Sequence, residues 1–373
     1  MPGARKSARR ALARAVFPAT GILAAICLAA QLPATSAAAA TAPPVKWSPR
    51  LGPVPGAKTS TAPALADVRL GTHRSDLFLF WTAPSDPPGF KISYARSISL
   101  RKDTWSAPAQ VLSGKVRTRS RPAAAPIGSA TSGQVIVVWR DAASSRILYS
   151  IGHEDKGGVL RWLGVQAVPG AASSVGPAVL QPLHSDAIVV TWRGAGGAVD
   201  DIVGFPSASG LVKWATGGAI PLATTASTPA IAEVSTGSES GRIFAVWQVP
   251  GSTGRVQFAI AADTAQGALK WSVPRALPPA VSTGAAPSAI AIGQDSAFPL
   301  LVVYRARHGS ALSYVTLASG GRVAGPFSVP HIRSFNGTAI SPGLLAAEDP
   351  GDVFYEPFVR VCAGCRAVTP GSR

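Results

Sequence analysis

Residues 133–150 read GQVIVVWRDAASSRILYS, and this stretch decides the fold because its pattern recurs along the chain. It holds an apolar run that ends in Trp139, a short polar turn, and a segment in which Ile147 and Tyr149 are two residues apart. The apolar run recurs as LFLFW, IVVTW, IFAVW and LLVVY, which end at Trp81, Trp192, Trp247 and Tyr304. Apolar runs without alternation are typical of strands covered on both faces.

A second aromatic series keeps step with the first. Its members are Trp47, Trp105, Trp162, Trp214, Trp271 and Phe327, spaced by 52 to 58 residues. All nine tryptophans of the chain belong to one of the two series. A period of this length, sustained over most of the chain, indicates a repeat architecture.

Each repeat contains four strand-like segments. The first begins at a proline, which a strand tolerates at its first residue: Pro63, Pro122, Pro177, Pro229, Pro287 and, in the last repeat, Pro342. The second is the apolar run, and the fourth opens on the second aromatic series. The third carries an apolar residue and an aromatic two positions apart, at Ile92/Tyr94, Ile147/Tyr149, Val203/Phe205, Val256/Phe258 and Leu312/Tyr314.

Four short strands per repeat predict an all-β protein, a six-bladed β-propeller of four-stranded antiparallel blades. The last repeat lacks a fourth strand, and WSPR at Trp47 has no preceding strands, so we expect an N-terminal strand to close the ring. The predicted domain is 41–366, and 367–373 is a tail. The predicted blades are 59–112, 117–168, 172–220, 225–278, 283–332, and 337–366 together with strand 45–50.

The first 40 residues have the order of a secretory signal peptide. Five basic residues, from Arg5 to Arg14, precede an apolar stretch at 21–30 and then small residues. The apolar part is shorter than the roughly 20 residues that span a bilayer. We therefore expect a secreted, extracellular protein without a membrane span in its mature form, with a retained membrane anchor as the alternative.

The remaining chain is strongly basic, with 30 Lys and Arg against 18 Asp and Glu. Such a charge favours anionic polymers as partners, although an arginine bias spread over the whole surface explains it equally well. No basic stripe with interleaved aromatics is present, so we expect no specific nucleic-acid partner.

Few residues indicate a metal or a cofactor. Cys362 and Cys365 have the spacing of a local disulfide, a redox pair or half of a zinc site; no strand–helix unit or further ligand accompanies them, which favours the disulfide. The five histidines share no metal-like spacing, and no glycine-rich phosphate loop occurs. The sequence predicts no metal and no cofactor.

The repeats resemble the fucose-binding and tectonin-like lectin propellers, on VIVVWRDAASSRILYS and on IVVTWRGAGGAVDDIVGF. This resemblance implies sugar sites between blades, where an aromatic stacks on the sugar and arginine binds its hydroxyls. The matching positions are Trp139, Arg140, Trp192, Arg193, Trp247, Tyr304 and Arg305; Thr82 and Gln248 replace arginine in two repeats. Packing between blades is the alternative role for the aromatics, and bonds to neighbouring blade carbonyls are the alternative for the arginines.

A weaker resemblance links HEDKGGVLRW and two similar turns to the Asp-box repeats of sialidase-like propellers. Glycoside hydrolysis needs a carboxylate pair, or a tyrosine nucleophile in sialidases. The candidate acids are Asp141, Asp200, Asp201, Glu233 and Glu356. Asp141 has no acidic counterpart in the other repeats, and a turn-initiating role is its alternative.

The sequence therefore predicts a monomeric, non-catalytic propeller that binds a glycan or cell-surface polysaccharide in its inter-blade clefts or its central channel. Two alternatives stay open: a sialidase-like glycoside hydrolase with one axial site, and an extracellular scaffold that binds another protein.

Overall fold

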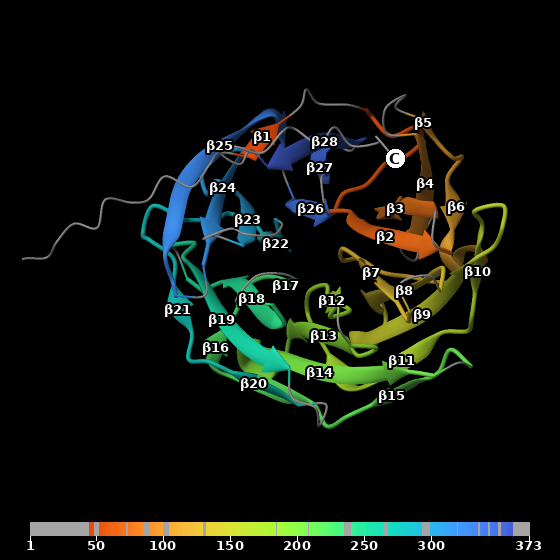
Figure 1. Cartoon of the computed structure of the whole chain (residues 1–373), viewed down its shortest axis with the longest axis horizontal. Helices are drawn as coiled ribbons and strands as arrows, with labels where there is room; N and C mark the ends of the chain where they lie inside the picture. Colours follow the sequence, from red (N-terminus) through yellow and green to blue (C-terminus); the bar gives the residue numbers. More distant parts are fainter. Residues whose placement is uncertain are drawn as a thin grey trace, which may run out of the picture. The chain divides into compact units, whose positions relative to one another are not determined.

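Antiparallel strands form almost all of the regular structure in the computed structural model (Figure 1). The model describes residues 45–47 and 52–360, apart from 72–73, 85–89, 100–103, 130–131, 184, 208, 235–239, 252, 264–267, 293–298, 319, 335, 342–343 and 350–351. The signal peptide expected at 1–40, Cys362, Cys365 and the tail at 367–373 lie outside the described residues. Two short 3₁₀ turns, η2 (Val111–Gly114) and η3 (Ala195–Gly197), interrupt the strands.

The strands of the described residues group into six sheets, which we number in chain order. Sheet I contains β2 (Ala64–Leu70), β3 (Arg74–Ala83), β4 (Lys91–Ser99), β5 (Thr104–Trp105) and β6 (Ala109–Gln110). Sheet II contains β7 (Ala123–Ile127), β8 (Gln134–Arg140), β9 (Arg146–Glu154), β10 (Leu160–Trp162) and β11 (Gln166–Ala172). Sheet III contains β12 (Ala178–Leu180), β13 (Ile188–Arg193), β14 (Ala198–Pro206), β15 (Val212–Trp214) and β16 (Gly218–Thr224).

The other three sheets follow the same order. Sheet IV contains β17 (Ala230–Val234), β18 (Arg242–Gln248), β19 (Val256–Asp263), β20 (Leu269–Trp271) and β21 (Arg275–Ala276). Sheet V contains β22 (Ser288–Ala291), β23 (Leu300–Arg305), β24 (Ala311–Leu317) and β25 (Val323–Arg333). Sheet VI contains β26 (Thr338–Ser341), β27 (Leu344–Asp349), β28 (Asp352–Arg360) and β1 (Val45–Trp47).

The sheets radiate from a central axis, so the chain is a β-propeller (Figure 1). The first strand of each sheet lies innermost, and each inner strand contacts the next: β2, β7, β12, β17, β22 and β26, which in turn contacts β2. In sheet VI, β1 pairs with β28 through Trp47 and Phe358. Five sheets are therefore continuous chain segments, and the remaining one combines segments from both ends of the described chain.

The aromatic series occupy the expected strands, but three details differ from the prediction. In sheets I to IV a fifth strand pairs with the third strand, whereas four strands were expected. The inner strand of sheet VI is Thr338–Ser341, and Pro342, which was expected to begin it, lies outside the described residues. The segment that follows, Leu344–Asp349, is the second strand instead.

The third difference is the alignment of β14. Cα partners across the second and third strands pair Val138 with Tyr149 in sheet II and Thr191 with Asp201 in sheet III. Asp201 therefore holds the position of Tyr149. The pair at this place of the repeat is Val199 and Asp201, four residues before the predicted pair Val203/Phe205. The cause is the short turn before β14, which brings Val199 level with Arg193.

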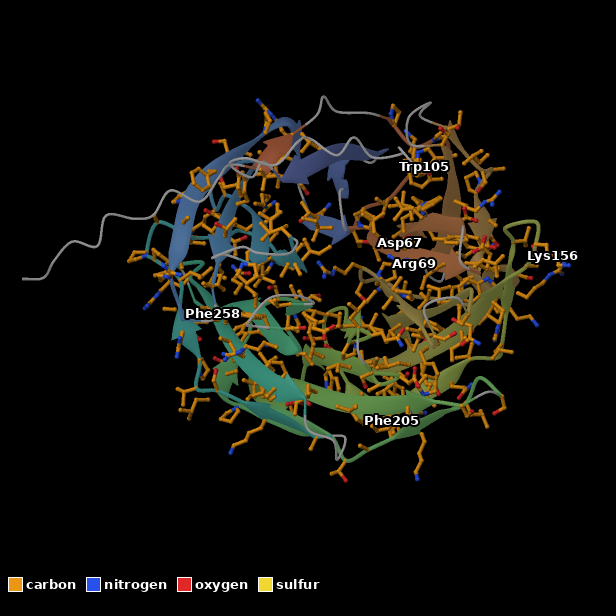
Figure 2. All side chains as sticks on the ribbon, viewed as in Figure 1. Asp67, Arg69, Trp105, Lys156, Phe205 and Phe258 are labelled. Carbon is orange, nitrogen blue, oxygen red and sulfur yellow. The ribbon has the colours of Figure 1, made fainter. Side chains whose placement is uncertain are left out.

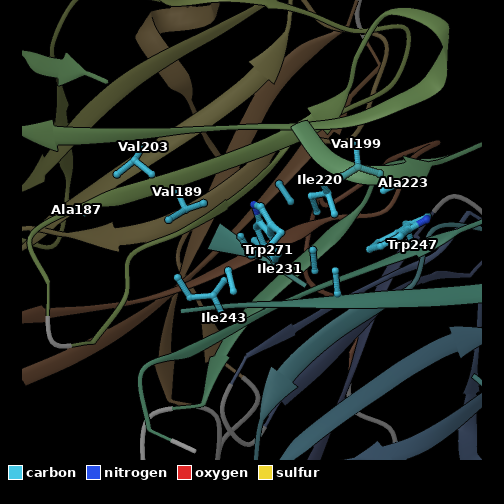
Figure 3. Packing of buried hydrophobic residues seen from close by; sticks show 14 residues of the cluster. Ala187, Val189, Val199, Val203, Ile220, Ala223, Ile231, Ile243, Trp247 and Trp271 are labelled. Atoms are coloured by element: carbon cyan, nitrogen blue, oxygen red, sulfur yellow. The ribbon is translucent and has the colours of Figure 1, made fainter. Parts of the chain in front are cut away.

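The core lies between neighbouring sheets, because each sheet is apolar on both faces. One such cluster contains Trp247 of sheet IV together with Val199 and Val203 of sheet III (Figure 3). Equivalent clusters join sheets I and II, II and III, and IV and V. Each fully buried large side chain contributes roughly 1.5–3 kcal/mol. In the part of the chain that is described, no helix is long and apolar enough to cross a membrane.

Candidate functional site

The aromatics predicted to stack on sugars lie inside the protein. The exposed fractions are 1% for Trp139, 5% for Trp192, 0% for Trp247 and 2% for Tyr304. Their counterpart Trp81 is also fully buried. A ring enclosed by protein has no face to offer a ligand, so the geometry favours packing between sheets, the alternative role noted for these residues.

The arginines that follow these aromatics bind backbone carbonyls. Arg140 Nε donates to the Ser173 carbonyl at 2.7 Å, and its Nη2 donates to Ser145 Oγ at 2.7 Å. Arg193 Nε donates to the Thr225 carbonyl at 2.8 Å. Arg305 Nη2 donates to the Gly284 carbonyl. The three side chains tie strands to the connections between sheets, and the structure does not bring them together in one site.

Gln248 and Thr82, which replace arginine in two repeats, also donate to backbone carbonyls. Gln248 Nε2 donates to the Thr283 carbonyl at 3.1 Å, and Thr82 Oγ1 donates to the Ser120 carbonyl at 3.0 Å. Because arginine, glutamine and threonine all reach such carbonyls, the recurrence of arginine after the aromatic does not require a ligand.

The sequence patterns described above did not include a Ser or Thr that recurs before each inner strand. One buried Ser or Thr precedes the inner strand of every sheet: Thr59, Thr118, Ser173, Thr225, Thr283 and Ser334. Its Oγ accepts a backbone N–H two or three residues ahead, at 3.0 to 3.2 Å. In five repeats this residue stands four positions before the proline, a spacing that the sequence already displays. In the last repeat the same spacing leads from Ser334 to Thr338, which begins β26.

The candidate acids have different roles. Asp141 Oδ2 accepts Ser144 N at 2.8 Å and Ser144 Oγ at 2.6 Å, so this residue initiates a turn. Asp155 in the Asp-box-like turn accepts Gly157 N and Val159 N at 2.9 and 3.0 Å, and the Val159 bond in particular holds the pKa of its carboxyl below the usual range. Asp200 is half-buried, and burial raises its pKa. Glu356 lies in β28.

Asp201 is buried between sheets III and IV. Its Oδ1 accepts the indole N–H of Trp271 at 3.1 Å. Burial raises the pKa of Asp201 to about 6, against the lowering effect of the Trp271 bond. The carboxyl replaces the aromatic that other sheets carry there and pairs with an outer-strand tryptophan, which is a structural role.

A cavity among the described residues lies on the axis, and we name it the wide cavity. Its volume is about 360 Å³, and inner-strand residues of all six sheets line it. Its floor is an apolar ring with one residue from each inner strand: Leu65, Ala124, Val179, Ile231, Ala289 and Ile340. Small-ligand sites are usually concave, mostly apolar and supplied with a few polar groups.

Charged and polar side chains line the wide cavity beyond the apolar ring. Asp67 and Arg69 come from β2, which places them at the inner edge of sheet I (Figure 2). Gln181 follows β12, and its amide donates to the Gly128 carbonyl at 2.8 Å. Glu233 of β17 accepts the Leu183 N–H and is 8% exposed. The cavity therefore combines an apolar floor with two carboxylates and one guanidinium.

Glu233 is the one candidate acid of the sequence analysis that lines this cavity. Asp67 and Arg69 were missed because their repeat counterparts differ from sheet to sheet and no motif marks them. Within the described ranges, no cluster of three or more His, Cys, Asp or Glu side chains is placed to hold a metal ion.

No protein-family model matches the chain, and no curated protein sequence matches it. Among solved structures, the chain is similar to a mutant of AofleA from Arthrobotrys oligospora in which three arginines are replaced by alanine. The identity is 14%, the TM-score is 0.59, and the match covers 85% of this chain and 87% of AofleA.

Two further structures are similar in fold. The NanB sialidase from Streptococcus pneumoniae matches with 11% identity and a TM-score of 0.54, over 84% of this chain and 71% of NanB. The SapL1 lectin in complex with alpha-methyl fucoside matches with 14% identity and a TM-score of 0.48, over 78% of this chain and 89% of SapL1. At these identities the likeness concerns the fold alone. The chain is a β-propeller whose architecture is similar to that of AofleA and of the NanB sialidase.

Proposed function

We propose that the protein is a secreted, non-catalytic propeller that binds a carbohydrate in the wide cavity. The observation that carries this proposal is the lining: an apolar floor with Asp67, Glu233 and Arg69 above it. Carboxylates accept hydrogen bonds from sugar hydroxyls, and a guanidinium donates to hydroxyl and ring oxygens. A volume of about 360 Å³ is within the usual range for small-ligand sites.

The axial position replaces the inter-blade clefts that the lectin resemblance implies. The second-strand aromatics and the arginines after them are engaged in packing and backbone contacts, so stacking on their rings would require neighbouring sheets to separate. The fold likeness to the NanB sialidase supports a propeller scaffold for sugar recognition.

The proposal also covers the organisation of the whole chain. It includes export directed by residues 1–40, and a monomeric ring of six blades with the bounds given above, closed by the strand at 45–47. A glycan or cell-surface polysaccharide is the proposed partner, and the excess of basic residues supports acidic polymers as a further class.

Glycan-array binding and pull-down of cell-wall polysaccharide test the proposed site. We expect the double variant Asp67→Asn/Arg69→Gln to bind at least tenfold more weakly, because each charge-assisted hydrogen bond is worth about 1.5–3 kcal/mol. The matched control is Asp186→Asn/Arg242→Gln, since both residues are exposed and neither lines the cavity. Unchanged binding by the cavity variant, or no binding by the wild type, would overturn the proposal.

A glycoside hydrolase is the second candidate, because Asp67 and Glu233 line the same cavity from β2 and β17. A carboxylate pair flanking the scissile bond is the usual requirement for this chemistry. Turnover of a fluorogenic glycoside panel that is lost in Asp67→Asn and in Glu233→Gln would favour the enzyme over the lectin. Binding without turnover would favour the lectin.

A further inference from the structure

A second, narrow cavity lies on the axis, next to the segments that lead into the inner strands. Its volume is about 80 Å³, and it is lined by Pro63, Pro122 and small inner-strand residues. The apolar ring that floors the wide cavity also lines this one. The two cavities therefore lie on opposite sides of the ring, and the narrow one has space for a few atoms only.

One position of the repeat surrounds this end of the axis. It is the residue directly before the inner strand's first proline or, in sheet VI, before Thr338: Ala62, Arg121, Gly176, Thr228, Ala286 and Gly337. Five of the six residues are small, and their close approach shows that the position is crowded. A Cβ on Gly337 would lie 3.3 Å from the Ala286 carbonyl oxygen and 3.6 Å from Ala62 Cβ. Arg121 is the exception in this series.

The space for Arg121 comes from the neighbouring repeat. A Cβ on Gly176 would lie 3.0 Å from Arg121 Cγ and 2.5 Å from its carbonyl oxygen. Any larger residue at 176 would collide with the arginine. Glycine also stands at this position in Gly337, so the departure from the repeat is Arg121 itself, the one long charged side chain in a series of small residues.

Arg121 is partly exposed, but two of its three guanidinium nitrogens are enclosed. Its Nε and Nη1 are inaccessible to water and make no hydrogen bond. Among the described residues, no carboxylate lines the narrow cavity. Two other polar side chains of the lining, Ser288 and Thr338, are bonded to each other: Ser288 Oγ donates to the Thr338 carbonyl and accepts Thr338 Oγ1 at 3.0 Å. Burial lowers the pKa of Arg121 to about 10, so the side chain remains a cation at neutral pH.

Enclosing two N–H groups of a cation without hydrogen-bond acceptors is unfavourable, because the hydration that these groups lose is not replaced by any described group. An anion in the narrow cavity would restore this interaction. The volume suits a carboxylate group, and a planar guanidinium matches carboxylate geometry better than it matches a spherical ion. The other lining groups are apolar or already bonded, which suits an anionic group with a small apolar attachment.

We propose that Arg121 forms a binding site for a carboxylate in the narrow axial cavity, carried either by a small organic acid or by an acidic sugar. This site is separate from the sugar contacts proposed for Asp67 and Arg69, which lie beyond the apolar ring. An acidic sugar would place only its carboxylate at Arg121.

Calorimetry and thermal unfolding with sodium acetate, glucuronate, glucose and chloride, at constant ionic strength, test the site. We expect acetate and glucuronate to bind and to raise the melting temperature of the wild type, whereas glucose and chloride do not act through this site. If only acetate binds, the site takes a small organic acid. If only glucuronate binds, the site takes an acidic sugar. No effect of either carboxylate beyond that of chloride would overturn the proposal.

Variants at Arg121 separate binding from structure. In Arg121→Met, carboxylate binding should fall at least tenfold, while the melting temperature without carboxylate should rise because enclosed N–H groups without acceptors are removed. Arg119→Met is the matched control, because Arg119 is exposed in the same segment, and it should bind as the wild type does. Arg121→Lys keeps the charge without the planar fork and should bind more weakly than the wild type.

An Arg121→Met variant that binds carboxylates normally would overturn the proposal, as would an Arg121→Lys variant that does so if the Met variant does not fold. The outcome is independent of the carbohydrate proposal, because acetate has no hydroxyl groups. Asp67→Asn should leave acetate binding unchanged, and Arg121→Met should leave binding of neutral glycans unchanged.

Discussion

At the residue scale, Asp201 shows how one position can depart from a repeat without becoming a catalytic group. Its counterparts are aromatic: Tyr94, Tyr149, Phe258 and Tyr314. Tyr94 and Tyr149 meet the outer tryptophan of the next sheet edge-on, at 5.8 and 5.4 Å between ring centroids. Asp201 instead accepts the N–H of the corresponding tryptophan, Trp271. A hydrogen bond thus replaces an aromatic contact.

This carboxyl should make stability depend on pH. Its pKa in the folded protein is about 6, above its ordinary value of 3.8, so the folded state binds the proton more tightly than the unfolded state does. Stability from this group is full below about pH 4 and is lost as pH rises through about 6. The loss corresponds to roughly 2–3 kcal/mol. Asn keeps an acceptor for Trp271 and does not titrate.

We therefore expect the free energy of unfolding of Asp201→Asn, relative to the wild type, to increase between pH 4 and pH 6.5. Denaturant unfolding across this range measures the difference. The exposed Asp186→Asn variant should show no such trend. A difference between Asp201→Asn and the wild type that does not change with pH would contradict the assignment.

At the element scale, the buried hydroxyls before the inner strands fix how each sheet is connected to the next. Thr225 Oγ1 accepts Ser227 N at 3.2 Å and approaches the Ser227 and Gln248 carbonyls at 2.8 and 3.1 Å. The second carbonyl belongs to β18, so this hydroxyl joins the connection to the strand beside it. Arg193 of sheet III bonds the Thr225 carbonyl, which brings three elements to one residue.

The substitution Thr225→Val keeps the shape of the side chain and removes its hydrogen bonds. We expect it to destabilise the protein by roughly 1–3 kcal/mol, the usual cost of leaving buried polar groups unpaired. The neighbouring Thr224→Val is the control, because Thr224 is exposed, and its effect should stay within about 0.5 kcal/mol. Equal melting temperatures for the two variants would show that the hydroxyl does not hold the connection.

Prediction from sequence was most successful where packing demands one kind of side chain. The apolar runs ending at Trp139 and Trp247 became second strands because both of their faces are covered, and only apolar residues satisfy that position. The register of sheet III was missed because a shorter turn moved Val199 and Asp201 into the places of an apolar residue and an aromatic. Pattern matching on aromatics follows Phe205 instead, which is 41% exposed.

The candidate site was predicted less well, for a physical reason. Residues that line the axis come from strands far apart in the sequence, one from each sheet, so no local spacing links Asp67 with Glu233. Arg121 was equally hidden: its distinction is the small size of its counterparts, which becomes meaningful only when the inner strands surround one axis. The repeated arginines attracted attention because they recur, yet recurrence in a propeller reflects the needs of the scaffold.

At the scale of the whole molecule, the proposed closure of the ring depends on β1. Val45 is buried against sheet V, in a cluster with Leu312 and Tyr314. The ring of Trp47 in sheet VI lies 5.7 Å from that of Tyr314 in sheet V. This contact is equivalent to the one that Trp214 of sheet III makes with Tyr149 of sheet II. The strand thus pairs with β28 and covers sheet V in the same way that other outer strands cover their neighbours.

If this strand closes the ring, Trp47 should matter for global stability as much as its counterpart Trp214, which is also half-buried. We expect Trp47→Ala and Trp214→Ala each to lower the free energy of unfolding by about 2–3 kcal/mol, somewhat below the cost for fully buried aromatics. Both variants should unfold in one cooperative transition, because every sheet depends on two neighbours. Denaturant unfolding monitored by fluorescence and by circular dichroism measures both quantities. If Trp47→Ala unfolds like the wild type while Trp214→Ala is destabilised, β1 is a dispensable strand and the remaining sheets hold the ring without it.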